Sequence, residues 1–281
     1  YVNTDKYEDE CSGKKLLNNF TKVSKDYSAL KYQKVKVLYK DKDKVFGVYA
    51  MTDDNTVVSA VMDQVKMDSA DKIKIDGTKY TVDTNNSTVY VNGKDTNTKI
   101  AVWVNAHSEG KNIGKASTVQ AISNSSNNKI NILKVTTFEV KEITYVGSDY
   151  VTAGTKYSDD DYVISDGLKK GDYALISKGS NYADSKGRIE KATVVEGEVT
   201  STKGSDEVMI DGTWYTMNTG VTAPKLNASA KLVLVNGYVY AVDTVTAGSS
   251  DVALVVEVGN SNTVGSKYYQ ARLILADGTD K

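Results

Sequence analysis

The sequence predicts an all-β protein made of small β-barrel or β-sandwich-like modules in tandem, with little helix. Val, Ile, Thr and Tyr dominate its short apolar runs, and the aromatic residues comprise 19 Tyr, 2 Trp and 3 Phe. Apolar and polar residues alternate within these runs, and clusters of Gly, Asn, Asp and Ser separate them. This is the composition of half-buried strands joined by tight turns.

The length predicts several modules. A single core seldom grows beyond about 100–200 residues, so the 281 residues are enough for about two to four domains. We expect a processed or excised piece of a longer protein, because the chain begins at Tyr1 and stops shortly after the turn signal at 276–279. The expected modules are a partial N-terminal β-module at 1–62, a β-module at 63–133, a β-module or insertion at 134–193, a β-module at 194–248, and the start of a truncated module at 249–281.

Two hairpins are predicted directly from turn chemistry. The strands Val35–Tyr39 and Val45–Tyr49 flank a charged loop at 40–44. Residues 231–235 and 238–242 flank Asn236-Gly237, a pair that suits a type I′ turn because both central positions need a positive φ. The strand at 89–91, followed by Asn92-Gly93, repeats this signal.

Helical periodicity is weak throughout the chain. Its best candidates are short, at Lys14–Phe20 and as one turn near Asp63–Met67. The apolar run Ile100–Val104 counts among the expected strands.

An internal repeat indicates that one hairpin unit is used twice. Residues 73–83 and 208–218 share the pattern Ile-Asp-Gly-Thr-x-Tyr-Thr. Each copy predicts a hairpin with an Asp-Gly turn and with its tyrosine, Tyr80 or Tyr215, on the inner face. Together with the flanking runs, each copy predicts about five strands and one long connection. A small closed or half-closed barrel, of the oligonucleotide-fold or SH3-like type, fits this order.

The charge pattern argues against nucleic acid and membrane as partners. The chain has 35 Lys and Arg against 36 Asp and Glu, with both signs scattered along its length, so no broad basic face is expected. The longest apolar runs, Val252–Val256 among them, have the length of a strand and fall far short of the roughly 20 residues of a membrane-spanning helix. We expect no membrane insertion.

Few residues suggest catalysis or zinc binding. Cys11 and His107 are the only residues of their kinds, so an internal disulfide is excluded, a zinc site is not expected, and a Ser-His-Asp triad would have to use His107. Cys11 is expected to be a small apolar filler, with intermolecular pairing as the alternative. His107 is expected in a solvated loop at Asn105–Gly110, the alternative being a catalytic or metal-bound histidine.

Calcium is the one metal that the sequence allows, and no other cofactor is expected. Asp159, Asp160 and Asp161 bring three carboxylates together, but the spacing of a twelve-residue calcium loop is absent. They therefore predict either a cation site or a charged turn.

Two further functional classes depend on the positions of side chains in space. A hydrolase needs two carboxyls roughly 5–10 Å apart in a cleft. Glu196 and Glu198 are two residues apart on one strand face, which indicates a charged surface exposed to solvent. Trp103, Trp214 and the tyrosines could stack on sugar rings, which makes a carbohydrate-binding module the leading alternative. Because Tyr80 and Tyr215 follow the repeat, we expect those two in the core.

The order of segments resembles the middle regions of clostridial-type surface proteins that carry S-layer homology domains. This resemblance covers roughly residues 35–245, and the anchoring repeats of such proteins are not in it. The segments that carry it are 37–49, 90–93, 119–124, 129–133, 140–143, 167–173, 196–200 and 210–215.

The resemblance implies a structural, non-enzymatic component of a bacterial surface layer or cell-envelope array. Such a protein is extracellular, lies at the cell surface and associates with copies of itself through the surfaces of its β-modules. Binding to cell-wall polymer would occur through regions outside this chain. The alternative is a carbohydrate-binding adhesin module of a cell-surface protein.

Overall fold

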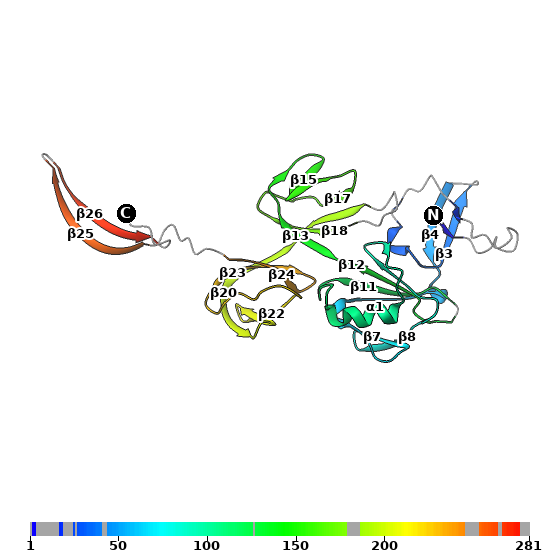
Figure 1. The fold of residues 1–281 in the computed structure, drawn as a ribbon. Coiled ribbons are helices and arrows are strands. Elements are labelled where there is room, and N and C mark those ends of the chain that lie inside the picture. Colours follow the sequence, from blue (N-terminus) through cyan, green and yellow to red (C-terminus); the bar gives the residue numbers. More distant parts are fainter. Residues whose placement is uncertain are drawn as a thin grey trace. The chain divides into compact units, whose positions relative to one another are not determined.

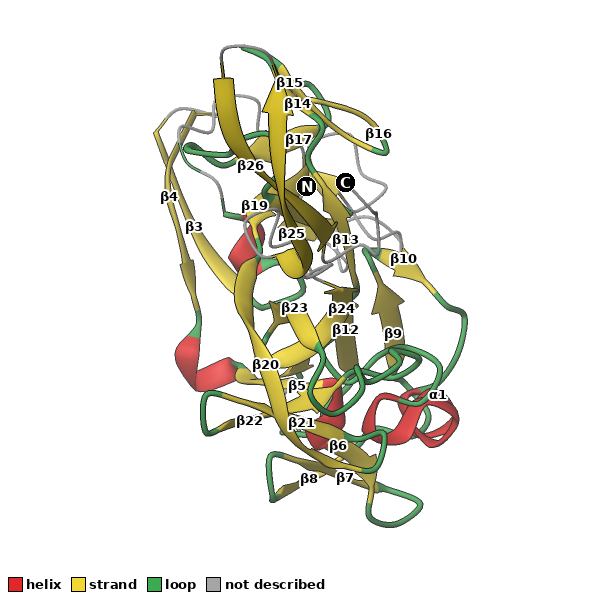
Figure 2. Cartoon of the chain, turned by 90° about the vertical axis from the view of Figure 1, so that its left-hand side faces the viewer, coloured by secondary structure: helices red, strands yellow, loops and turns green. Residues whose placement is uncertain are grey.

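The computed structural model describes residues 2–3, 17–18, 25, 27–40, 44–125, 127–178, 186–244, 253–263 and 266–275. These residues form small β-sheets, and the longest helix among them is α1 (Ile100–His107) (Figure 1, Figure 2). The predicted all-β fold of small modules is confirmed. The chain divides into two compact units, Tyr1–Lys191 and Ala192–Lys281. No helix in the described residues has the length and apolar character needed to cross a membrane.

The N-terminal segment contains two short two-stranded sheets. One joins β1 (Val2–Asn3) to β2 (Leu17–Asn18), and the other joins β3 (Val35–Lys40) to β4 (Lys44–Ala50). The predicted hairpin at 35–49 is therefore confirmed, with its loop at 41–43 outside the described residues. The helix expected at 14–20 is wrong at Leu17-Asn18, which form a strand, and the rest of it lies outside the described residues.

The first barrel spans residues 56–136, and two sheets enclose its core. One sheet has the order β10-β9-β12-β11-β5 and the other the order β6-β7-β8. Its elements are β5 (Thr56–Val61), η4 (Met62–Gln64), β6 (Val65–Met67), β7 (Lys72–Ile75), β8 (Thr78–Thr81), β9 (Thr88–Val91), β10 (Lys94–Asp95), α1, η5 (Ser108–Gly110), β11 (Thr118–Ser123) and β12 (Ile132–Thr136). A 3-10 turn, η3 (Thr52–Asp54), precedes β5.

The strand order of the first barrel is that of an oligonucleotide-fold barrel. The turn η4 splits strand 1 into β5 and β6, so the helical turn expected near Asp63–Met67 covers only Met62–Gln64. β7 is strand 2, β8 and β9 form strand 3, and β11 and β12 are strands 4 and 5. Strand 5 pairs in parallel with β9, and strand 4 pairs with β5. Taken around the barrel, neighbouring strands follow the order 1-2-3-5-4 and return to strand 1, which is the Greek-key arrangement of this fold.

The segment 100–107 corrects two sequence predictions. It forms α1, between strands 3 and 4, where the sequence predicted a strand at Ile100–Val104 and a loop around His107. Ile100, Trp103 and Val104 are buried in the core of the first barrel. Positions i, i+3 and i+4 lie on one face of a helix, so this spacing fits a helix that covers the end of the barrel.

The second barrel spans residues 138–191 and follows the same path. Its two sheets have the orders β13-β18-β19-β17 and β14-β15-β16, and strand 1 is split between them as β13 and β14. Strand 3 contacts strand 5 through the parallel pair β17 and β19. The segment 138–191 is thus a barrel of the same type. Its strands are β13 (Phe138–Glu142), β14 (Tyr145–Val146), β15 (Tyr150–Ala153), β16 (Thr155–Ser158), β17 (Tyr162–Ile164), β18 (Tyr173–Ser177) and β19 (Gly187–Lys191).

The third barrel spans residues 193–244 and is closed, in the order β20-β21-β22-β24-β23. Its first strand pairs with β23 along Thr193–Glu198 and with β21 along Val199–Lys203. The strands β22 and β24 are parallel, as strands 3 and 5 are in the other barrels. Its strands are β20 (Thr193–Lys203), β21 (Glu207–Ile210), β22 (Thr213–Met217), β23 (Ser229–Val235) and β24 (Tyr238–Thr244).

The repeat tyrosine has the same place in all three barrels. Tyr80, Tyr157 and Tyr215 each lie on strand 3. Their register partners on strand 2 are the fully buried Ile73, Val151 and Val208. Tyr157 is buried and the other two are half-buried against their cores.

The predicted turns have the expected backbone. Asn236-Gly237 and Asn92-Gly93, predicted from the type I′ signal, have φ of 50° and 84°, and 50° and 77°. The Asp-Gly turns of the repeat, Asp76-Gly77 and Asp211-Gly212, have φ of 45° and 79°, and 49° and 75°. These left-handed values are available to Gly and tolerated by Asn and Asp, which is why the sequence signal was decisive.

Each barrel has its own core. The first core includes Val58 and Ala60 of β5, so a strand that precedes residue 63 belongs to it. The second core lies between Ile143 and Ile189, and the third between Val195 and Val242. After the third barrel, β25 (Ala253–Thr263) and β26 (Ser266–Leu275) form a long curved hairpin (Figure 1).

Candidate assembly surface

The hairpin β25–β26 exposes several large apolar side chains. Leu254, Val258 and Tyr269 are 67%, 63% and 82% exposed. Val255, Val256 and Ile274 are exposed on the same two strands. The cause is the two-stranded sheet itself: β25 and β26 pair only with each other among the described residues, so no second layer covers their faces. Exposed apolar clusters of this kind mark interaction surfaces.

A second exposed apolar surface lies on the hairpin β3–β4. Phe46 is 77% exposed, and Leu38 and Tyr49 are exposed as well. In the described part of the chain these two strands also pair with no third strand. Their unpaired edges leave backbone N–H and C=O groups available to another strand.

The two hairpins carry exposed charged side chains of both signs. Glu257 lies on β25 opposite Arg272 of β26. Lys36 is exposed on β3, in register with Tyr49 of β4. Unpaired strand edges that carry side chains of opposite charge are suited to pairing with one another.

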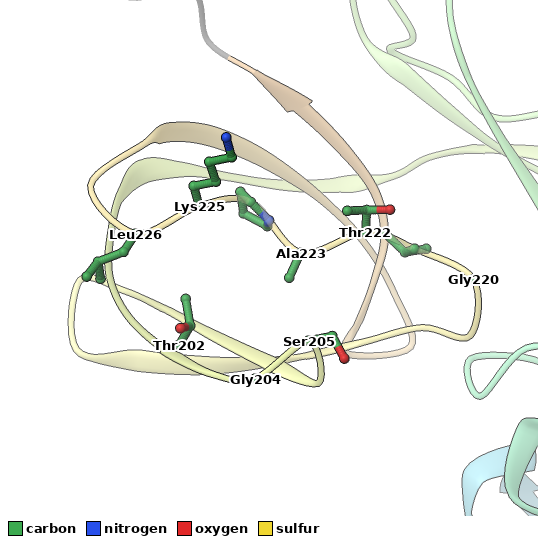
Figure 3. A pocket seen from close by; sticks show the side chains of 10 residues that line it. Thr202, Gly204, Ser205, Gly220, Thr222, Ala223, Lys225 and Leu226 are labelled. Atoms are coloured by element: carbon green, nitrogen blue, oxygen red, sulfur yellow. The ribbon is translucent and has the colours of Figure 1, made fainter.

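Two shallow hollows in the barrels lack carboxylates. One, of about 650 Å³, is lined by residues of the loops at 202–205 and 220–226, with Lys225 as its charged residue. Figure 3 shows Lys225 pointing away from Thr202 and Ser205. The other, of about 480 Å³, lies on the first barrel beside Lys134. Burial lowers the pKa of the Lys134 ammonium group. Neither hollow offers the pair of carboxyls that glycoside hydrolysis requires.

Asp159, Asp160 and Asp161 form the turn between β16 and β17, and all three are exposed. Their backbone groups make the turn: the Asp161 amide donates to Ser158 O, and the Lys186 ammonium donates to Asp159 O at 2.5 Å. No group of three or more His, Cys, Asp or Glu side chains able to hold a metal is found in the described residues. Calcium binding at this turn stays a prediction.

His107 ends α1 and does not lie in a loop. Its ring stacks on Trp103 with 4.2 Å between ring centroids, and its Nδ1 lies 2.8 Å from Trp103 O. Cys11 lies outside the described residues. The Glu196 carboxylate is held by the Lys231 ammonium at 2.8 Å, whereas Glu198 is exposed beside it.

The aromatic side chains divide between core and surface. Trp103 is buried, and Trp214 is half-buried with the Lys203 ammonium 4.0 Å from its ring centroid. Tyr145 and Tyr150 stack at 5.3 Å between centroids on the second barrel, with Tyr145 51% exposed. Tyr32 and Tyr90 also stack, at 4.3 Å between centroids, but both are half-buried. The Tyr145–Tyr150 pair, with its exposed Tyr145, presents stacked aromatic rings of the kind that sugars bind.

Sequence reasoning missed two features that leave a signal in the chain. The segment Gly154-Thr155-Lys156-Tyr157-Ser158 is a third, looser copy of the repeat and would have identified the second barrel. The exposed hairpin could have been found from Val255-Val256-Glu257, which repeats Val194-Val195-Glu196. Comparison with family models, curated proteins and solved structures finds no match to this chain.

Proposed function

We propose that this protein is a structural component of a bacterial surface layer or cell-envelope array and associates with itself through its β-module surfaces. The observation that carries the proposal is the exposed apolar surface of β25–β26, where Leu254 is 67% and Tyr269 82% exposed. Such a surface is costly in water and favours contact with another protein surface. The resemblance of residues 35–245 to clostridial-type surface proteins supports the same function.

The proposal includes an extracellular location, contact with cell-wall polymer through regions outside this chain, and no enzymatic activity. Modules of this size support it, because a domain of about 60 residues buries only roughly 60% of its unfolded surface. Contacts between copies would add stability that the small cores lack. An unbroken series of barrels with one repeated strand path also suits a scaffold better than a catalyst.

Sedimentation velocity over a wide range of concentrations tests this proposal. The wild-type chain is expected to form larger species as its concentration rises, and Leu254→Lys to shift that transition to higher concentration. Leu226→Lys is the matched control, since Leu226 is 53% exposed in a loop of the third barrel. A chain that stays monomeric at high concentration, with and without calcium, would contradict the proposal.

A carbohydrate-binding adhesin is the second candidate, and the Tyr145–Tyr150 pair favours it. These stacked rings lie on strands 1 and 2 of the second barrel, and oligonucleotide-fold barrels bind oligosaccharides on the face around strands 2 and 3. Binding of cell-wall glycans that Tyr145→Ala abolishes would favour this function over a purely structural one.

A further inference from the structure

The hairpin β3–β4 is the structural equivalent of strands 4 and 5 of the third barrel. In β23–β24 the register runs from Val235↔Tyr238 and Leu234↔Val239 to Val233↔Ala241, so that Tyr240 forms a bulge. In β3–β4 it runs from Lys40↔Lys44 and Tyr39↔Val45 to Leu38↔Gly47, so that Phe46 forms the bulge. In both hairpins an aromatic residue therefore forms the bulge, directly after the second register pair counted from the loop. Aligned on this bulge, Lys36 corresponds to Lys231.

The hairpin β25–β26 in turn corresponds in sequence to strands 1 and 2, although its two strands pair in a different register. A constant offset of 61 residues aligns Val194-Val195-Glu196 with Val255-Val256-Glu257 and Gly204-Ser205 with Gly265-Ser266. Each segment begins with a strand of 11 residues, β20 or β25, that pairs antiparallel with the next strand in the chain, β21 or β26. In this alignment Glu257 corresponds to Glu196.

The third barrel shows how these two equivalents fit together. Glu196 of strand 1 is in register with Lys231 of strand 4, and the two side chains form an ion pair at 2.8 Å. The same segment of strand 1 pairs with strand 4 over Thr193–Glu198. The corresponding edge of β25, over residues 254–259, pairs with no strand in the described chain, and neither does the outer edge of β3.

We propose that β25 of one copy pairs antiparallel with β3 of a second copy, so that Glu257 faces Lys36. The proposal rests on the self-association proposed above and names its interface. It sets Val256 opposite Val37 and covers apolar side chains that are exposed on both hairpins, Leu254 and Leu38 among them. Main-chain pairing along a free edge supplies affinity, and the ion pair fixes the register.

This contact joins two different surfaces of the molecule. A heterologous contact of this kind leaves each copy with one surface free for the next, so that it builds a ring or an open filament instead of a closed dimer. The proposed interface therefore accounts for an extended assembly without any further contact.

Charge reversal tests the proposal in both copies. Glu257→Lys places two lysines at the contact and Lys36→Glu places two carboxylates there, so each variant alone is expected to associate roughly three- to tenfold more weakly than the wild type. An equimolar mixture of the two variants restores an opposite-charge pair at every contact and is expected to regain wild-type association. Sedimentation velocity measures all three samples, and circular dichroism confirms that each variant keeps its β-structure.

Glu198→Lys is the control, because Glu198 is an exposed strand carboxylate in a barrel that is already closed. This variant should associate as the wild type does. If the chain assembles but the mixture is no tighter than either variant, the interface is wrong while self-association stands. If Lys36→Glu has no effect, β3 is not the partner of β25, which also overturns the proposed contact. A wild type that remains monomeric would defeat the proposed function itself.

Discussion

At the scale of single residues, Lys134 is a half-buried cation on the outer side of the first barrel. It lies on β12, in register with Gln120 of β11 and Tyr90 of β9. Burial lowers its pKa, and the charge of Lys134 adds to burial in lowering the pKa of Lys31. No ion pair involving Lys134 is found in the described residues. Holding this side chain charged in the folded state therefore costs free energy at neutral pH.

We expect Lys134→Met to raise the free energy of unfolding at neutral pH by roughly 0.5–2 kcal/mol. The folded pKa of Lys134 lies below its unfolded value, so the unfolded state binds more protons in the window between them. Wild-type stability thus rises as the pH climbs through that window, and the advantage of the variant shrinks toward a pH of about 10.5. Urea unfolding at pH 7 and pH 9.5 measures both effects.

Lys94→Met provides the comparison, because Lys94 is exposed on β10 of the same sheet. Its effect on the free energy of unfolding should stay within about 0.5 kcal/mol. A Lys134→Met variant that is less stable than the wild type at pH 7 would mean that the ammonium group has a favourable partner.

At the scale of elements, α1 is the piece that the first barrel adds to the shared strand path. It inserts between strands 3 and 4, lies against β6 and β9, and carries Trp103, which is 5% exposed in the core of the barrel. In the third barrel the same connection, from β22 to β23, is a loop without an α-helix. The helix therefore serves as a plug that fills the end of the first core.

Trp103→Ala is expected to lower the free energy of unfolding by about 3–5 kcal/mol, because it leaves a large cavity under α1. Val102→Ala lies on the same helix but removes a side chain that is 64% exposed, so its effect should be within about 0.5 kcal/mol. Guanidinium unfolding of both variants gives the difference. Equal and small effects would show that α1 is not anchored by Trp103.

Elements were predictable from sequence where local chemistry decides the backbone. Asn236-Gly237 and Asp211-Gly212 specify their turns because few other residues adopt those φ values. The helix α1 was missed because Ile100–Val104 is rich in β-branched and aromatic residues, which favour strands locally, while tertiary packing selects the helix. The exposed hairpin was not recognised as a surface, because exposure depends on which strands pair with it.

At the scale of the whole molecule, one strand path is used three times in succession. Strand 5 of each of the first two barrels is followed by strand 1 of the next after a single residue, Thr137 or Ala192. Before the series, β3–β4 repeats the register and aromatic bulge of strands 4 and 5, and after it β25–β26 repeats part of the sequence of strands 1 and 2. Each core consists of residues from one continuous stretch of chain, so each barrel has the contacts of an independent folding unit.

This organisation predicts that the third barrel folds alone. A fragment of residues 192–244 contains all five strands of a closed barrel and its core, so it is expected to unfold cooperatively. Its free energy of unfolding should be below about 5 kcal/mol, because so short a chain buries a small core. Thermal unfolding followed by circular dichroism and the dispersion of amide resonances are the measurements.

A fragment of residues 56–117 is the negative control for the same experiment. It keeps strands 1 to 3 and α1 of the first barrel but removes β11 and β12, whose Val119, Leu133 and Val135 are fully buried in that core. Such a fragment exposes its remaining core and should be unfolded or aggregated. If residues 192–244 alone gave no cooperative transition, the barrel would depend on its neighbours, and the chain would then fold as one extended structure instead of a series of separate units.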